Sequence, residues 1–293
     1  MGKAARLKQP TARERLAAQR AAESRRAQAR RRLMIMGGAI VAVIVVVVAF
    51  VVVSANQKPP APAGSSDNAQ ITKELASVST ATFDAVGAGT AAGLKPISGE
   101  PALAKDGKPE VLYVGGEYCP FCAAERWAIA TALSRFGTLS VSHLIHSSPT
   151  DSYPNTPTLS FTGSSYTSKY LAFTPVEMYG ETPDSSTPTG YAYLQQPTTE
   201  QASLLTKVGG GSFPFLDIAN QYTLAQGAQY VSSDLAGLTW SQIATDVQNP
   251  SSTVAKDIDG AANIITAALC KVTGGQPGNV CSSAGVKAAA GSL

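Results

Sequence analysis

Charged residues are scarce in this sequence. Asp, Glu, Lys and Arg together make up 15% of the 293 residues, whereas 44% are hydrophobic. Disordered chains combine high charge with low hydrophobicity, so this composition excludes a wholly disordered chain. We therefore expect a folded body with an apolar core.

An excess of positive charge is missing from most of the chain. Residues 1–32 hold 11 Lys or Arg and two Glu, so the remaining 261 residues hold 12 basic and 18 acidic side chains, a net charge of −6. Surfaces that bind nucleic acid need clustered positive charge to follow the phosphates. The sequence therefore predicts that the body has no nucleic-acid partner.

A long run without charges separates the basic start from the body. Residues 33–53 are 21 uncharged, mostly apolar residues, and a helix of that length rises about 30 Å, the thickness of a bilayer's hydrocarbon core. We expect a single transmembrane helix over residues 33–54. Because residues 30–32 are arginines that abut this run, the basic segment 1–32 is expected to be cytoplasmic. The chain is thus predicted to be a single-pass protein of the cell membrane.

Two other interpretations of the start are open. Val53-Ser54-Ala55 resembles a signal-peptide cleavage site, but the apolar run is longer than the usual length of about 7–15 residues. Arg25 and Arg26 resemble a twin-arginine signal, but residues 27–29 are not the apolar residues expected there. We therefore favour a retained anchor.

The exported body divides into a linker and a domain. Residues 55–70 contain Pro, Ala and Ser in a pattern typical of a semi-extended linker. No internal repeat is visible, so residues 71–293 are expected to form one extracytoplasmic domain. Residues 147–197 are rich in Ser, Thr, Pro and Tyr, and we expect them to be a large insertion in which 170–179 is extended.

Strand and helix patterns alternate, which predicts an α/β fold. Residues 111–114 form a β-favouring run, 120–136 have apolar residues at helical spacing, and 139–145 form a second run. This order predicts a βαβ unit. The later pattern predicts a helix over 199–208, a strand over 213–219, and helices over 240–247 and 254–269.

Only four cysteines are present, and none precedes residue 119. An even number outside the cytoplasm fits disulfide chemistry in an oxidising compartment. A bridge between Cys270 and Cys281 would close a loop of about a dozen residues, which stabilises a protein by roughly 3 kcal/mol. We expect a structural disulfide there. A relay that passes electrons to the other pair is the open alternative.

The other two cysteines form a Cys-Pro-Phe-Cys motif where the first strand meets the following helix. The sulfur of Cys119 would lie beside unpaired N–H groups and the positive end of the helix dipole, which stabilise a thiolate. A lowered pKa improves a thiol both as nucleophile and as leaving group. We expect Cys119 to attack and Cys122, one turn into the helix, to resolve the mixed disulfide. Pro120 suits the first helical position.

The order of these features resembles the thioredoxin superfamily: a strand, the motif, a helix, a strand, and a later Phe213-Pro214 that leads into another strand. Residues 115–127, GGEYCPFCAAERW, are more closely similar to a membrane-anchored, thioredoxin-like family known as domain of unknown function 929. That similarity extends over most of residues 70–293. It implies a thioredoxin-like fold in which a cis Pro214 faces the cysteine pair, and in which the backbone of Phe213 pairs with an extended substrate.

Motif and resemblance together predict a membrane-anchored thiol–disulfide oxidoreductase that acts on thiols and disulfides of exported or envelope proteins. We expect no cofactor, because electrons would pass to or from a membrane redox partner. Glu117 is the acidic residue nearest the motif and is a candidate proton acceptor; alternatively its charge simply raises the pKa of Cys119. Phe121 brings no positive charge, so a middling redox potential is expected. Oxidation, reduction and isomerisation all stay open.

The alternatives to thiol–disulfide exchange are a metal or haem site and a non-catalytic binding domain. His143 and His146 are the sequence's two histidines, and on a strand a spacing of three puts them on opposite faces, so we expect no metal site. Ala123 stands where a covalent haem would need histidine. The remaining alternative is a non-catalytic, thioredoxin-like binding domain in which Cys119 and Cys122 form an inert disulfide.

Overall fold

The computed structural model describes residues 65–225 and 227–293. The expected cytoplasmic segment 1–32 and the expected transmembrane helix 33–54 lie outside these residues. Neither described range contains a helix with the length and hydropathy needed to span a bilayer.

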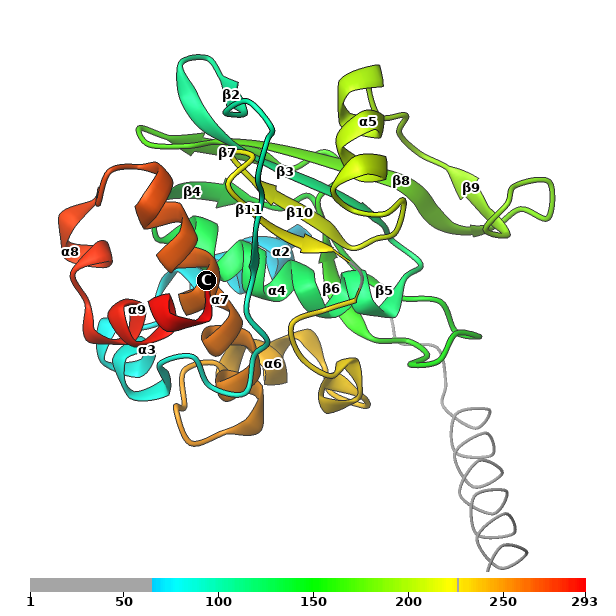
Figure 1. The fold of residues 1–293 in the computed structure, drawn as a ribbon. Coiled ribbons are helices and arrows are strands. Elements are labelled where there is room, and N and C mark those ends of the chain that lie inside the picture. The colour runs from blue at the N-terminus through cyan, green and yellow to red at the C-terminus, as the bar shows by residue number, and fades with distance from the viewer. Residues whose placement is uncertain (1–64, 226) are drawn as a thin grey trace, which may run out of the picture. The chain divides into compact units, whose positions relative to one another are not determined.

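A central mixed sheet organises the described residues (Figure 1). Its strands lie in the order β1 (Lys95–Pro96), β11 (Tyr222–Ala225), β10 (Phe215–Ile218), β3 (Lys108–Gly116), β8 (Ala172–Pro183) and β9 (Tyr191–Tyr193), with β2 (Ala104–Lys105) paired to the start of β3. The strands β3 and β8 are parallel, and the other paired neighbours are antiparallel. The predicted α/β class is confirmed.

Helices cover both faces of this sheet. On one face α4 (Pro120–Ser134) packs against α7 (Thr253–Val272), and on the other lies α5 (Thr199–Lys207) (Figure 1). The other described helices and 3-10 turns are α2 (Ser65–Ala76), α3 (Thr80–Val86), α6 (Trp240–Asp246), α8 (Gly278–Cys281), α9 (Ala284–Ala289), η1 (Ser232–Leu235) and η2 (Ala290–Ser292).

The strand β3 lies in the middle of the core and contributes side chains to both layers. Successive residues of a strand point to opposite faces. Val111 and Tyr113 belong to the larger apolar cluster around α4 and α7, whereas Leu112 and Val114 belong to the smaller cluster under α5. All four side chains are at most 1% exposed. Burial on both faces explains why this strand could be recognised from a continuous apolar run.

The second strand of the predicted βαβ unit is not 139–145, and that prediction is wrong. The parallel partner of β3 is β8. The chain after α4 instead forms two separate two-stranded sheets, in which β4 (Gly137–Ser140) pairs with β7 (Ser165–Ser168), and β5 (His143–His146) pairs with β6 (Pro157–Ser160).

The strand β8 lies inside the range 147–197, which the sequence led us to expect as an insertion. Part of that range is therefore a central strand of the main sheet. Its sequence hides this role, because Pro175 and Glu177 both argue against a buried central strand. Glu177 is tolerated there because Arg126 pairs with it in the core. The segment added between α4 and β8 consists of residues 135–171.

The folded region also begins earlier than the expected boundary at residue 71. The helix α2 starts at Ser65, inside the range 55–70 that was expected to be a linker. Ile71 and Leu75 are each 2% exposed and lie one helical turn apart, so they anchor this helix on the core. The other predicted helices and the strand near 213–219 are confirmed, as α4, α5, α6, α7 and β10.

The contact between α4 and α7 contains buried polar groups. Arg135 donates hydrogen bonds to Asn263 Oδ1 at 2.8 Å and to Thr266 Oγ1 at 3.1 Å, and its guanidinium carbon lies 4.0 Å from the ring centre of Phe83. Asp259 is fully buried, and neither carboxylate oxygen has a hydrogen-bond partner within the described part of the chain. Burial raises the pKa of Asp259 to about 8, although the charge of Arg135 opposes this shift.

Asp259 should make the stability of the protein depend on pH. The folded protein holds a proton on Asp259 that the unfolded chain loses above the ordinary pKa of 3.8. The free energy of unfolding should therefore fall as pH rises towards about 8, by up to about 1.4 kcal/mol per pH unit from this group. Asp259→Asn removes the titration, so the variant should be more stable than the parent by a margin that grows with pH.

Urea denaturation of both proteins at several pH values between about 5 and 8 measures that margin. Asp106→Asn, in the exposed turn between β2 and β3, is the control and should follow the parent. An Asp259→Asn margin that stays constant over this range would contradict the assignment.

Candidate active site

The Cys-Pro-Phe-Cys motif lies where the sequence predicted it, at the junction of β3 and α4. Cys119 is the N-cap residue of α4, with extended backbone angles, and Pro120 occupies the first turn. The sulfur of Cys119 accepts a hydrogen bond from the backbone N–H of Cys122 at 3.4 Å. The helix start therefore supplies a donor to this sulfur, because the first N–H groups of a helix have no partner inside it.

The two cysteines are free thiols with different surroundings. Cys119 is 6% exposed, whereas Cys122 is completely buried. A hydrogen bond from the Cys122 thiol lowers the pKa of Cys119 against the opposing effect of burial, and backbone N–H groups and the charge of Arg126 lower it further. Burial, together with that donated hydrogen bond, raises the pKa of Cys122. The pair is thus polarised, with the negative charge favoured on the more accessible sulfur.

A buried ion pair lies one turn further along the helix. Arg126 and Glu177 are both fully buried, and two hydrogen bonds join them, Nε to Oε1 at 2.7 Å and Nη2 to Oε2 at 2.8 Å. Nη2 also donates to the carbonyl oxygen of Gly116 at 2.8 Å, the same oxygen that accepts from the N–H of Cys119. The pair therefore joins α4 to β8 and to the end of β3.

Two polar atoms beside this pair lack partners in the part of the chain that the structure describes. These are Nη1 of Arg126 and the hydroxyl of Tyr113, and both are buried. The guanidinium carbon lies 5.9 Å from the ring centre of Tyr113. The charges of both thiols act on Tyr113, which lies on the α4 side of β3. Two buried donors without partners therefore belong to residues that interact electrostatically with the thiols.

Sequence reasoning missed the importance of Arg126 and did not consider Glu177. Arg126 is four residues after Cys122, and this spacing puts two side chains on one side of a helix. That signal was available from the sequence. Nothing in the sequence links Arg126 to Glu177, because the two residues meet only once β8 has paired with β3.

The candidate proton acceptor Glu117 is 8% exposed. Its Oε1 atom accepts a hydrogen bond from Thr162 at 2.9 Å and another from Ser160. These hydroxyls belong to the end of β6 and the residues that follow it, so the added segment 135–171 holds the carboxylate in place. Two hydroxyl donors thus fix the position of this oxygen.

Phe213 and Pro214 lie next to the motif. The peptide bond between them is cis, and Pro214 is buried at the entry to β10. The ring centre of Phe213 is 6.2 Å from that of Tyr118, the residue before Cys119. A Cβ atom added to Gly116 would lie 3.4 Å from the Phe213 ring, so glycine lets the two segments approach. The folding of the chain thus brings together residues that lie nearly a hundred positions apart.

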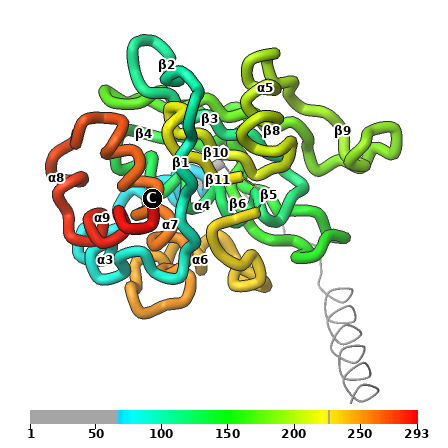
Figure 2. Tube along the Cα trace, in the orientation of Figure 1, coloured from blue at the N-terminus to red at the C-terminus, as the bar shows by residue number. Residues whose placement is uncertain are grey.

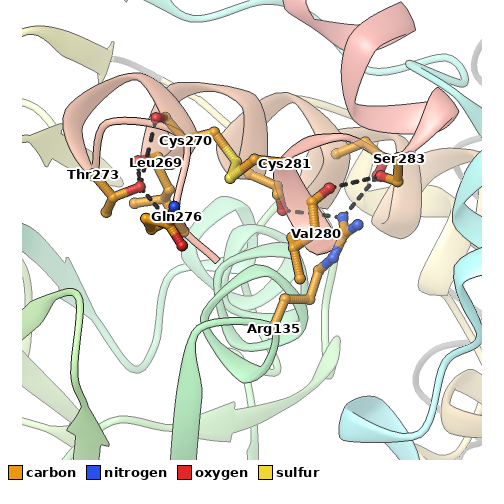
Figure 3. The surroundings of a disulfide bond; sticks show 10 residues. Arg135, Leu269, Cys270, Thr273, Gln276, Val280, Cys281 and Ser283 are labelled. Carbon is orange, nitrogen blue, oxygen red and sulfur yellow. Dashed lines mark hydrogen bonds between the residues drawn. A yellow bond between two sulfur atoms is a disulfide. The ribbon is translucent and has the colours of Figure 1, made fainter. Parts of the chain in front are cut away.

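The second cysteine pair forms a disulfide, as predicted. Cys270 at the end of α7 is bonded to Cys281 in α8, and the link closes the loop between these helices (Figure 3). Thr273 Oγ1 donates to the carbonyl oxygens of Leu269 at 2.9 Å and Gln276 at 2.6 Å, which fixes the start of the loop. The bond and these contacts fasten the last helices to α7.

The two histidines lie on β5, in a small sheet outside the central one. His143 is exposed, and the ring of His146 packs on Trp240 with the ring centres 4.4 Å apart. Burial lowers the pKa of His146 to about 4. Among the described residues, no group of three or more His, Cys, Asp or Glu side chains has an arrangement that could hold a metal ion.

Comparison with known proteins yields one match. A family model described as Domain of unknown function (DUF929) matches residues 97–271, a range that contains the motif, the buried ion pair and the cis proline. No curated protein matches the chain, and no solved structure does.

The buried ion pair gives a prediction about stability. Arg126→Met leaves the carboxylate of Glu177 buried without its partner, which should lower the free energy of unfolding by about 3–5 kcal/mol. The double variant Arg126→Met/Glu177→Gln removes both charges, so it should recover much of this loss. Urea denaturation of the full-length variants measures both values. A single variant within about 1 kcal/mol of the parent would show that the pair does not hold the core.

Proposed function

Because the chain belongs to the family described as Domain of unknown function (DUF929), whose description names no activity, we propose a function from the site itself. The proposed activity is thiol–disulfide exchange on exported or envelope proteins, carried out by Cys119 and Cys122 without a cofactor.

The observation that carries this proposal is the polarity of the cysteine pair. Exchange needs one sulfur that is accessible and easily ionised, and a second that attacks it afterwards. Cys119 has a lowered pKa and some exposure, and Cys122 is buried with a raised pKa. A purely structural disulfide does not require its two cysteines to differ in pKa and exposure. The position of Cys119 at the N-cap of α4 is the physical source of part of it.

The reaction consists of two displacements. The Cys119 thiolate attacks one sulfur of a client disulfide, which forms a mixed disulfide and releases the other client sulfur as a thiolate. Cys122 loses its proton and attacks the Cys119 sulfur, which releases the client's first sulfur. Two electrons have then passed from the cysteine pair to the client, and the pair is a disulfide. The same steps in reverse oxidise a client dithiol.

The buried groups around Cys122 support its part in this sequence. Cys122 reacts only as a thiolate, and burial opposes its ionisation. The charge of Arg126 lowers the pKa of Cys122, and Nη1 of this residue has no hydrogen-bond partner among the described residues. In this proposal Arg126 is a positioning residue that stabilises the developing thiolate. Glu117 is proposed as the proton acceptor at the outer end of the motif.

The proposed fold is that of a thioredoxin-like domain with residues 135–171 added between α4 and β8. The parallel pair β3 and β8 joined through α4, and the cis Phe213-Pro214 bond ahead of the antiparallel β10, support this proposal. In it, Phe213 and Pro214 border the groove for an extended client segment, which would pair its backbone with that of Phe213.

The proposed setting is the outer side of the cell membrane. The apolar run at residues 33–53 would anchor the chain, and the basic segment 1–32 would stay in the cytoplasm. A disulfide between Cys270 and Cys281 is in keeping with an oxidising compartment. A redox enzyme of the same membrane would restore the cysteine pair after each turnover.

Trapping of mixed disulfides tests the proposed exchange. Cys122→Ser removes the resolving thiol, so Cys119 should remain linked to client proteins in native membranes. Nonreducing gels should show new species of higher mass that disappear on reduction. The matched variant Cys119→Ser/Cys122→Ser should form none of them. If the Cys122→Ser protein forms no more adducts than this control, the proposed function is wrong.

A further inference from the structure

A continuous set of aromatic side chains lies next to the motif. We call it the aromatic strip, and it consists of Tyr118, Tyr179, Tyr191, Tyr193 and Phe213. Tyr118 stacks on Tyr191 with the ring centres 4.2 Å apart and the planes nearly parallel. Tyr179 stacks on Tyr193 at 4.9 Å, and Phe213 lies 6.2 Å from both Tyr118 and Tyr179. The strip therefore runs from the residue before Cys119 to the edge strand β9.

The outer end of the strip is open to solvent. Tyr193 is 49% exposed and the next residue, Leu194, is 45% exposed, which are among the highest values for large apolar side chains in the described residues. Phe121, between the two cysteines, is 37% exposed. Figure 2 shows β9 and the turn before it at the side of the molecule opposite α7. Exposed aromatic surface is thus present on β9 and between the two cysteines.

Acidic side chains border this strip. Asp151 lies three residues after Ser148, whose N–H donates to the carbonyl oxygen of Tyr118 at 2.7 Å, and the charge of Asp151 acts on Tyr118. Glu181 follows Tyr179 by two residues on β8, and Asp184 lies in the turn between β8 and β9. No ion pair joins Asp151, Glu181 or Asp184 to a cation within the described ranges. Glu181 instead accepts a hydrogen bond from the N–H of His146 at 3.2 Å, and Asp184 accepts one from the hydroxyl of Ser186 at 2.6 Å.

The described cations near the strip in sequence, Arg126, Lys169 and Lys207, form no ion pair with these carboxylates. Arg126 is buried, and its charge is matched by Glu177. Lys169 is the one lysine between residues 109 and 206, and it precedes the opposite end of β8, where Ala172 pairs with Glu110. Seven residues of strand separate that end from Tyr179, which corresponds to about 23 Å.

We propose that the aromatic strip selects clients that carry lysine or arginine next to the reacting cysteine. This inference rests on the proposed exchange function and names its substrate class. Cations bind over the faces of tyrosine rings, and nearby carboxylates strengthen the attraction. A field of one sign also raises the rate at which oppositely charged segments arrive. The strip would hold such a segment in extended form beside Cys119.

Model peptides of different charge test this selection. Each peptide contains a central cysteine in a disulfide with the same neutral thiol, and lysine, serine or glutamate on both sides of it. The rate of mixed-disulfide formation is measured with the full-length Cys122→Ser protein. The lysine peptide should react about tenfold or more faster than the glutamate peptide at low salt. The ratio should shrink at about 0.5 M salt, which screens surface charges.

The Cys119 thiolate itself attracts a basic peptide, so variants of the strip are needed. Glu181→Gln/Asp184→Asn removes two border charges and keeps an oxygen acceptor at each position. This variant should lower the lysine-to-glutamate rate ratio by about threefold or more. The control Asp106→Asn/Glu200→Gln removes two charges from the β2–β3 turn and α5, and should leave the ratio unchanged. Tyr193→Leu should lower the lysine-peptide rate, whereas Tyr193→Phe keeps the ring face and should not.

The outcomes separate this inference from the proposed function. If all peptides react rapidly at equal rates, or the border variant keeps the full ratio, exchange stands and the charge selection is wrong. If no peptide reacts, exchange itself is wrong. In that case calorimetry measures the binding affinity of peptides that carry serine in place of cysteine. Tighter binding of the lysine peptide, lost in the border variant, supports the selection; equal binding overturns it.

Discussion

The buried ion pair between Arg126 and Glu177 is the interaction on which the rest of this site depends. Removing two charges from water costs several kcal/mol per ion, so such a pair persists only with good geometry. Here two parallel hydrogen bonds and a third to Gly116 provide that geometry. Because the partners lie on α4 and β8, the pair fixes the helix start against the sheet, and the motif lies at that start.

The site combines opposite electrostatic surroundings within a short distance. Inside, a single buried guanidinium and the first N–H groups of α4 favour negative charge on sulfur. Outside, the aromatic strip begins at Tyr118, the residue before Cys119, and the carboxylates near it form no ion pair within the described ranges. The inner groups determine which cysteine ionises. The outer groups are proposed to select the polypeptide segments that approach it. The residues added between α4 and β8 contribute to both regions. Inside, the N–H of Phe161 donates a hydrogen bond to Glu177, and outside, the charge of Asp151 acts on Tyr118.

Local patterns predicted the elements that depend on local physics. The apolar run at residues 111–114, the helix that starts at Pro120 and the two cysteine pairs could all be recognised, because spacing and burial on both faces leave clear signals. Residues 170–179 were expected to be extended, but their place in the central sheet, as part of β8, was missed, since the charge of Glu177 is balanced only by a residue distant in sequence. The aromatic strip was also missed, because it too forms only when segments distant in sequence meet. Its tyrosines come from three separate segments that meet only in the folded sheet.

The rate of Cys119 alkylation as a function of pH is the most direct test of the central claim, that the fold polarises this cysteine pair. The full-length chain is reduced mildly and treated with iodoacetamide, and each modified residue is identified by mass spectrometry. The account predicts a titration midpoint for Cys119 below the ordinary value of about 8.5, with Cys122 unmodified at the same pH. An ordinary midpoint, or equal modification of both thiols, would contradict it.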